Sequence, residues 1–451
     1  MKKLLAILTC PILLFSYTID FKTSLNKTIE NNKGLKAKKF EIEESKLDLN
    51  EAKGYDYGNL VFNQNISNTN HAGYVFGMKT SSREAKMSDF GFTAIPPAGT
   101  PVGNIAPDAL NNPDARTNYE TKVTYKVPLF TGFKLKNAKK MAKLQILAKT
   151  AKYNYDEKAL GLEVLKAYNG AVASKEFIKA TQKAKEATSS FVEFASELYK
   201  EGLVTSIDVK QAKVYDMGVD ANMIEAKNRF DLALSYLRFL TSDELITDVK
   251  EFRNISNELL SLETLQNKAH ENRDDFAWMR YNTQTMKSKI DFEKSSKYPT
   301  IGAQIEYGYN DDTFNNINGD QDYYLGAIGL SYTLFDGAIS ASKEQKAKIQ
   351  YKKINNHFEY MKDGIKLEVE KNILTLQAKA KILKQKIKAQ NLSDEVLEQS
   401  QEMYKNHLIN MSNLLMQQAN QQKSNAETIM AKYEKSLAAA RLQLSLGEKL
   451  K

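Results

Sequence analysis

The chain has 451 residues, 42% hydrophobic content and a formal net charge of +9. This composition would support a core in two or three domains. The lysines are interleaved with glutamates rather than clustered in one patch, which argues against binding of nucleic acid. One cysteine and four dispersed histidines provide neither a disulfide nor a metal cluster. No nucleophile, phosphate-binding loop or cofactor motif is recognisable, so we expect no enzyme and no cofactor.

Residues 1–18 have the features of a secretory signal peptide. Two lysines follow Met1, and the apolar run that comes next, residues 4–15, is too short to span a bilayer. We therefore expect the mature protein to leave the cytoplasm. The cysteine in this segment, Cys10, lacks the sequence context of a lipidation site, so we expect it to be lost with the leader; lipidation is the alternative.

The prolines are unevenly distributed. Five of the eight lie in one stretch, at Pro96, Pro97, Pro101, Pro107 and Pro113, and none lies between residues 129 and 298 or after 299. Proline removes a helical hydrogen bond and clashes with the preceding turn. The two proline-free tracts, of about 150 residues each, therefore permit very long helices.

An internal repeat organises the chain. At a constant offset of 205 residues, LFTG at 129–132 matches LFDG at 334–337, LEV at 162–164 matches LEV at 367–369, and YK at 199–200 matches YK at 404–405. Upstream, residues 53–60 align with 294–301 at an offset of 241, so the first copy carries 36 extra residues, which include the proline-rich stretch. The duplication predicts two copies of one structural plan.

The predicted elements follow this plan in both copies. The first copy, residues 19–241, comprises a helix, a strand at 60–76, an external loop at 77–118, a strand at 119–129, a long helix at 134–201, a turn at 202–205 and a helix at 206–240. A linker at 242–257 leads to the second copy, residues 258–451, with a helix at 260–296, a strand at 301–309, a loop at 310–323, a strand at 324–334, a long helix at 338–406, a turn at 407–410 and a helix at 410–446. Each long helix would measure about 100 Å, and its apolar stripe favours coiled-coil packing.

The predicted strands each have one apolar and one polar face. Their two-residue alternation fits a half-buried sheet in a soluble protein or a transmembrane barrel strand. Four strands are too few to close a barrel, so a membrane barrel would require several chains. Its lumen would be lined by a mixed-charge set, which predicts weak ion selectivity. This set is Glu120, Lys122, Lys126, Gln304 and Glu306.

Three segments together resemble the TolC-like outer-membrane efflux protein family. They are VPLFTG at 127–132, its twin YTLFDG at 332–337, and LYKEGLVTSIDV at 198–209. The resemblance covers essentially the whole mature chain. It implies a mixed α and β fold, in which a long α-helical coiled-coil barrel joins a transmembrane antiparallel β-barrel that is closed only by trimerisation, with four strands per chain and twelve in total.

The resemblance also implies partners. The expected assembly is a homotrimer in the outer membrane lipid of a Gram-negative bacterium, docked onto a periplasmic adaptor (membrane fusion protein) and an inner-membrane pump of the RND or ABC type. It would serve efflux or type I secretion as a passive duct. The alternative from another class is a soluble periplasmic coiled-coil adaptor or scaffold whose strands form a small sandwich.

The two turns between helices are the candidate gate. In the first turn, Gly202 can take the left-handed conformation that ends a helix, and Thr205 and Asp208 have the spacing of a capping box. The resemblance implies that such turns converge at the closed tunnel end, where an acidic ring can form. Asp208 is then either a gate residue or only a cap. Tyr199 and Leu203 complete this turn.

The second turn departs from that pattern. His407, Asn410 and Asn413 stand where the first turn has Gly202, Thr205 and Asp208. Asn410 can still cap a helix, so we expect the turn to be kept without a second acidic ring. Gating would then depend on Asp208, on Asn413 and on packing by two tyrosines. These are Tyr199 and its counterpart Tyr404.

Overall fold

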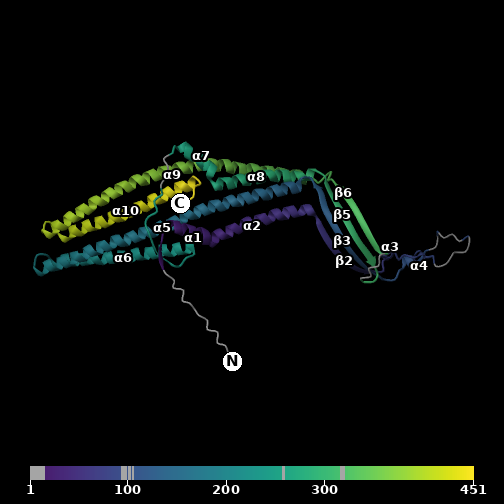
Figure 1. Ribbon diagram of the computed structural model, residues 1–451, viewed down its shortest axis with the longest axis horizontal. Coiled ribbons are helices and arrows are strands. Elements are labelled where there is room, and N and C mark those ends of the chain that lie inside the picture. Colours follow the sequence, from purple (N-terminus) through teal and green to yellow (C-terminus); the bar gives the residue numbers. More distant parts are fainter. Residues whose placement is uncertain are drawn as a thin grey trace, which may run out of the picture. The chain divides into compact units, whose positions relative to one another are not determined.

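The computed structural model describes residues 16–92, 99, 103, 106–255, 260–314 and 320–450 (Figure 1). Most of the predicted leader, with Cys10, lies outside the described residues, as do three prolines of the proline-rich stretch, Pro96, Pro97 and Pro101. The chain divides into two units. One comprises Met1–Glu43, Leu147–Tyr281 and Asn355–Lys451, and the other Glu44–Ile146 and Asn282–Ile354. We call them the helical unit and the sheet unit.

The sheet unit contains a four-stranded antiparallel sheet, with its strands side by side in Figure 1. The strands are β2 (Asn59–Thr69), β3 (Arg116–Thr131), β5 (Thr300–Asp311) and β6 (Asp322–Ser331), in the order β2-β3-β5-β6. Each repeat thus supplies one antiparallel pair, and the two pairs meet between β3 and β5. Among the described residues, β2 and β6 are each paired on one side only.

Several predicted strand limits are wrong. β2 ends at Thr69 rather than at residue 76, because residues 72–81 form helix α3 (Ala72–Ser81), in which Val75 is buried. β3 begins at Arg116, inside the predicted loop 77–118. The described part of that loop also contains two short helices. These are η2 (Met87–Phe90) and α4 (Asp108–Asn111).

Residues close in sequence explain the structure at the strand ends that precede the long helices. β3 contains an irregularity between Pro128 and Phe130, where proline can provide no ladder hydrogen bond. β6 ends at Ser331 rather than at residue 334. Shortly afterwards the Asp336 carboxylate accepts a hydrogen bond of 2.9 Å from the Ser340 amide, which caps the next helix.

Four helices lie within one residue of their predicted ranges. They are α5 (Lys134–Lys200), α6 (Ser206–Thr241), α9 (Ile339–Lys405) and α10 (Met411–Ser445). The others are α1 (Phe21–Asn31), α2 (Lys33–Gly54), α7 (Leu262–Asn272) and α8 (Asp274–Lys294), with short turns η1 (Tyr55–Tyr57) and η4 (Ser295–Lys297). None of the described helices is both long and apolar enough to cross a lipid bilayer.

The single helix predicted over 260–296 is interrupted at Arg273. This residue is extended, with φ −76° and ψ 119°, and it separates α7 from α8. Its guanidinium is 8% exposed and pairs with Asp275 at 2.7 Å and with Glu368 at 2.6 Å. Burial of a charge is tolerated only with such partners. One of them, Glu368, is distant in sequence, so a tertiary contact accompanies the helix break.

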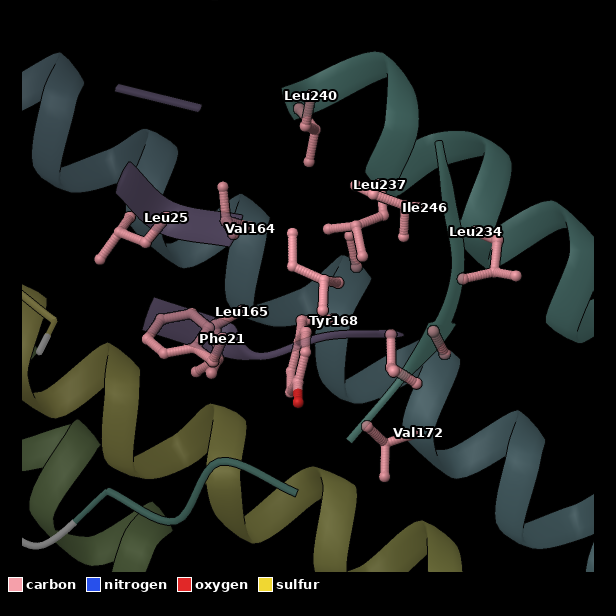
Figure 2. Packing of buried hydrophobic residues seen from close by; sticks show 14 of the residues in the cluster. Phe21, Leu25, Val164, Leu165, Tyr168, Val172, Leu234, Leu237, Leu240 and Ile246 are labelled. Atoms are coloured by element: carbon pink, nitrogen blue, oxygen red, sulfur yellow. The ribbon is translucent and has the colours of Figure 1, made fainter. Parts of the chain in front are cut away.

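The predicted linker 242–257 contains a strand. β4 (Ile246–Val249) pairs in parallel with β1 (Tyr17–Ile19), which overlaps the predicted end of the leader at residue 18. Beside this pair lies the main core of the helical unit, shown in Figure 2, where Leu165, Tyr168 and Leu237 are each at most 1% exposed. Burying one such side chain contributes about 1.5–3 kcal/mol, so this cluster holds α5 and α6 to β4.

Candidate functional site

The first turn joins α5 to α6 with two hydrogen bonds that end a helix. The Gly202 amide donates to the Tyr199 carbonyl at 3.0 Å and the Leu203 amide to the Leu198 carbonyl at 2.9 Å. Gly202 has φ +75°, the left-handed conformation that this arrangement requires. The predicted role of Gly202 as a helix terminator is confirmed.

The next helix begins with the predicted capping pair. The Asp208 carboxylate accepts hydrogen bonds from the Thr205 amide at 3.0 Å and from the Thr205 hydroxyl at 2.7 Å. Thr205 itself is extended, with φ −88° and ψ 160°, as expected of an N-cap. The side chain of Asp208 is therefore engaged within its own turn.

The second turn has the same backbone in spite of its different residues. His407 has φ +58°, and its amide donates to the Tyr404 carbonyl at 3.0 Å. The Asn410 side chain accepts a hydrogen bond of 2.9 Å from the Asn413 amide and so caps α10. The prediction that Asn410 preserves this turn is confirmed, and histidine adopts a conformation that glycine takes at less cost.

The two tyrosines that the repeat equates occupy different environments. Tyr404 is 4% exposed and its ring lies 5.9 Å from that of Phe194, whereas Tyr199 is 51% exposed. Burial, and then the negative charge of Asp208, raise the pKa of the Tyr404 phenol above its ordinary value. Of the pair expected to pack at the turns, Tyr404 therefore belongs to the core, and Tyr199 does not.

A hydrophobic cluster joins the two turns. Residues from α5, α6, α9 and α10 contribute to it, among them Leu198, Met411 and Leu414. Val204 and Ile409, which occupy equivalent positions in the turns, pack against it. Four apolar side chains on the turns face solvent instead, and they are Tyr199, Leu203, Ile207 and Leu408.

The polar face of the sheet carries a connected network. Lys122 lies 3.0 Å from a Glu120 oxygen and 3.7 Å from a Glu306 oxygen. Thr124 donates to Glu306 at 2.9 Å, and Gln304 reaches the same carboxylate at 3.4 Å. Four of the five predicted residues thus lie together, while Lys126 is exposed and outside this network.

Besides Thr124, two further members of the network, Tyr323 and Asn65, lie outside the set predicted from the sequence. The Tyr323 hydroxyl lies 3.1 Å from a Glu306 oxygen and 3.4 Å from a Glu120 oxygen, and Asn65 donates to Glu120 at 2.7 Å. Tyr323 is the last residue of the predicted loop 310–323, whereas in the structure it belongs to β6. Extending the two-residue alternation back by one position would have found it.

The opposite face of the sheet is apolar and exposed. One row crosses all four strands, with Phe62 opposite Val123, Val123 opposite Tyr307, and Tyr307 opposite Tyr324. Their exposed fractions are 65%, 38%, 57% and 86%. Other exposed apolar residues of this face are Leu60, Ile66, Tyr125, Ile305, Ile328 and Leu330. In water, so large an apolar surface is a site of contact with lipid or protein.

The sequence of the chain matches a profile that describes the outer membrane efflux proteins, over residues 97–242 and 265–448. The chain belongs to the outer membrane efflux protein family. This confirms the resemblance found in the sequence. Membership in this family assigns the chain to the outer membrane rather than to an enzyme class.

Comparisons with individual proteins are consistent with this family. The outer membrane protein TolC of Vibrio cholerae is 25% identical over 210 residues, which are 45% of this chain and 48% of TolC, so the match spans about half of that protein. A membrane protein from Pseudomonas aeruginosa has a TM-score of 0.80 at 14% identity, covering 96% of this chain and 92% of that chain. The outer membrane protein VceC of Vibrio cholerae has a TM-score of 0.77 at 12% identity, covering 96% of this chain and 97% of VceC. The predicted fold class is confirmed.

Proposed function

We propose that the chain is one protomer of a homotrimeric outer-membrane duct, which passes solutes from the periplasm to the outside. The observation that carries this proposal is the sheet, which has one apolar face, one polar face and an unpaired edge at β2 and at β6 among the described residues. Open edges are not tolerated in lipid. Three copies joined edge to edge give twelve strands, enough to close a barrel.

The two faces then have separate roles. The apolar face, with Phe62, Tyr307 and Tyr324, contacts lipid, and the polar network around Glu120, Lys122 and Glu306 lines the lumen together with Gln304 and Lys126. Since this lining carries both signs of charge, selectivity among ions is weak there. The ion pairs of Lys122 with Glu120 at 3.0 Å and with Glu306 at 3.7 Å support this, because paired charges attract a passing ion less than a ring of charges of one sign does.

The helical turns form the periplasmic entrance. Tyr199, Gly202, Leu203, Thr205 and Asp208 belong to the first turn, and Tyr404, His407, Asn410 and Asn413 to the second. In this proposal Asp208 contributes to a constriction at the closed entrance. The entrance opens when a periplasmic adaptor and an inner-membrane pump of the RND or ABC type dock there. The exposed apolar side chains Leu203, Ile207 and Leu408 support a contact surface at the turns.

Disulfide trapping between chains tests the shared barrel. In a Cys10→Ser background, Asn63→Cys in β2 and Ala327→Cys in β6 lie on the polar face, because they are paired with Lys122 and Gln304. Combined in one chain, the two cysteines are expected to yield covalent trimers after mild oxidation. Each single variant is the matched control and should yield none. Since the register between chains can differ by two residues in either direction, two further pairs are tested, Asn63→Cys with Leu325→Cys and Asn65→Cys with Ala327→Cys, which also lie on the polar face. Absence of trimers with all three pairs contradicts the shared barrel.

A further inference from the structure

Three carboxylates converge at one end of the sheet. One carboxylate oxygen from each of Glu84, Asp311 and Asp312 lies within 4.8 Å of the others. Asp311 is the last residue of β5, Asp312 follows it, and Glu84 comes shortly after α3, which contacts β5. Their sequence positions gave no metal-ligand spacing, so this cluster exists only through the fold. All three belong to the sheet unit.

Asp311 is the unusual member of the cluster. Its side chain is 0% exposed. Oδ1 accepts a hydrogen bond of 2.8 Å from the Thr313 amide, but Oδ2 has no hydrogen-bond donor among the residues that the structure describes. A buried carboxylate oxygen without a donor or counter-charge is strongly unfavourable. A cation held between the three carboxylates would supply that counter-charge.

One cation, Arg116, is already present and, among the described residues, pairs with two of the three carboxylates but not with Asp311. Its guanidinium pairs with Glu84 and, at 3.3 Å, with Asp312, and it donates to the Ser82 hydroxyl at 3.0 Å. Within the described part of the chain, no ion pair joins it to Asp311. Three carboxylates and one guanidinium leave two negative charges. A divalent ion would balance them.

We propose that Glu84, Asp311 and Asp312 form a divalent-cation site, and that the ion it takes is Ca²⁺. Carboxylate oxygens are hard ligands, which favour Ca²⁺ or Mg²⁺ over metals that prefer nitrogen or sulfur. Ca²⁺ accepts irregular geometry and completes its coordination with water, whereas Mg²⁺ demands a near-ideal octahedron. The three carboxylates come from two separate segments of the chain, and one is buried and one exposed, so this irregular set suits Ca²⁺ better than Mg²⁺.

The ion would tie the segment after α3 to the end of β5. Glu84 lies between the exposed residues Arg83 and Lys86, both of which are trypsin targets. Binding at Glu84 would hold this stretch against the sheet and slow cleavage there. This role goes beyond the proposed duct and does not rest on it, because every ligand belongs to one chain.

Calorimetric titration of the detergent-purified full chain with CaCl₂, after removal of metal with EDTA, tests the site. We expect one Ca²⁺ per chain with a Kd on the order of 10⁻⁴ to 10⁻³ M, and affinity for Mg²⁺ at least about tenfold weaker. Asp311→Asn should lose at least about tenfold in Ca²⁺ affinity. Asp108→Asn is the matched control, since Asp108 is an exposed carboxylate in α4 whose oxygen accepts a hydrogen bond of 2.7 Å from Asn112. It should bind as the unaltered chain does.

Trypsin digestion gives an independent measurement in case Asp311→Asn fails to fold. In the unaltered chain, Ca²⁺ is expected to slow cleavage after Arg83 and Lys86 several-fold relative to EDTA, and Glu84→Gln should abolish this difference. The proposal is overturned if the unaltered chain binds no Ca²⁺ at millimolar concentration, if Asp311→Asn binds it equally well, or if cleavage is the same with Ca²⁺ and EDTA.

Discussion

Gly202 and His407 hold the same position in two equivalent turns. Both are left-handed, with φ +75° and +58°, and both donate their amide to the carbonyl of a tyrosine three residues earlier at 3.0 Å. The duplication has therefore kept the backbone of the turn while its side chains changed. A residue with a side chain is strained in this conformation by about 1 kcal/mol relative to glycine, so the second turn carries a cost that the first does not.

Replacing His407 with glycine should therefore stabilise the protein. We expect a gain of about 0.5–1 kcal/mol, offset in part by the greater freedom of glycine in the unfolded chain. Gly202→Ala is the reverse substitution and should destabilise the protein. No atom lies within 4 Å of a Cβ added there, so its cost is conformational rather than steric. Thermal melting of the purified protein measures both, and a lower melting temperature for His407→Gly contradicts the account of the turn.

Substitution of Asp208 distinguishes a role in the gate from a role in helix capping. Loss of its two hydrogen bonds to Thr205 in Asp208→Ala should cost about 0.5–2 kcal/mol of stability. If Asp208 also narrows the entrance, the variant should in addition raise the leak conductance of the closed duct in planar bilayers. Ser261→Ala removes a cap at the start of α7, where Ser261 accepts a hydrogen bond of 3.2 Å from Thr264, and should leave conductance unaltered. Equal conductance in the unaltered duct and Asp208→Ala would reduce Asp208 to a cap.

Glu344 should make stability depend on pH in the acid range. Lys297 and Lys348 lie 2.6 and 2.7 Å from its carboxylate oxygens and lower its pKa to about 2 from 4.5. A carboxyl whose folded pKa is depressed stabilises the fold above its unfolded pKa. This contribution is therefore full above about pH 4.5 and is lost as the pH falls towards 2.

Two substitutions test this dependence by acid titration of the melting temperature. Glu344→Gln should flatten the curve between about pH 4.5 and 2. Lys297→Gln removes the largest cause of the shift and should move the loss of stability to higher pH. Because both lysines are about half exposed, high salt should weaken the effect. A curve for Glu344→Gln that parallels that of the unaltered chain would show that this carboxylate carries no such linkage.

The proline-rich stretch should tolerate change in one part and not in another. A side chain at Gly91 would collide with Pro107, and α4 contacts η2, so residues 106–113 pack locally. Replacing residues 93–105 with a Gly-Ser segment of equal length should leave trimers intact, as expected of an external loop. Deleting residues 106–113 should lower the melting temperature, because it removes that packing. Loss of trimers in the first variant, seen by gel electrophoresis, refutes the loop assignment.

Much of the architecture was predictable from the sequence. The long helices follow from the absence of proline between residues 129 and 298 and after Pro299, and from helical apolar spacing. The sheet follows from alternation around Lys122 and Glu306. Local patterns do not encode contacts between distant segments. No glycine or proline marks the helix break at Arg273. The break coincides with ion pairs from Arg273 to Asp275 and Glu368.

The same limit applies to the candidate sites. Gly202, Thr205, Asp208 and Asn410 were found because a helix end and a cap are short-range features. Tyr404 is buried against Phe194, whereas Tyr199 is exposed, and this difference depends on packing between helices. The sequence repeat aligns the two tyrosines and therefore cannot predict it. Pairing of β1 with β4 and the acidic cluster at Asp311 likewise depend on segments more than two hundred residues apart.

The central claim is that three chains share one barrel in the outer membrane. The most direct test is fractionation of the expressing cell, followed by gel electrophoresis of the detergent-extracted outer membrane with and without boiling. We predict a trimer in that fraction that persists in unboiled samples and dissociates to monomers on heating. A soluble monomer in the periplasm would contradict the shared barrel and favour a periplasmic coiled-coil adaptor or scaffold.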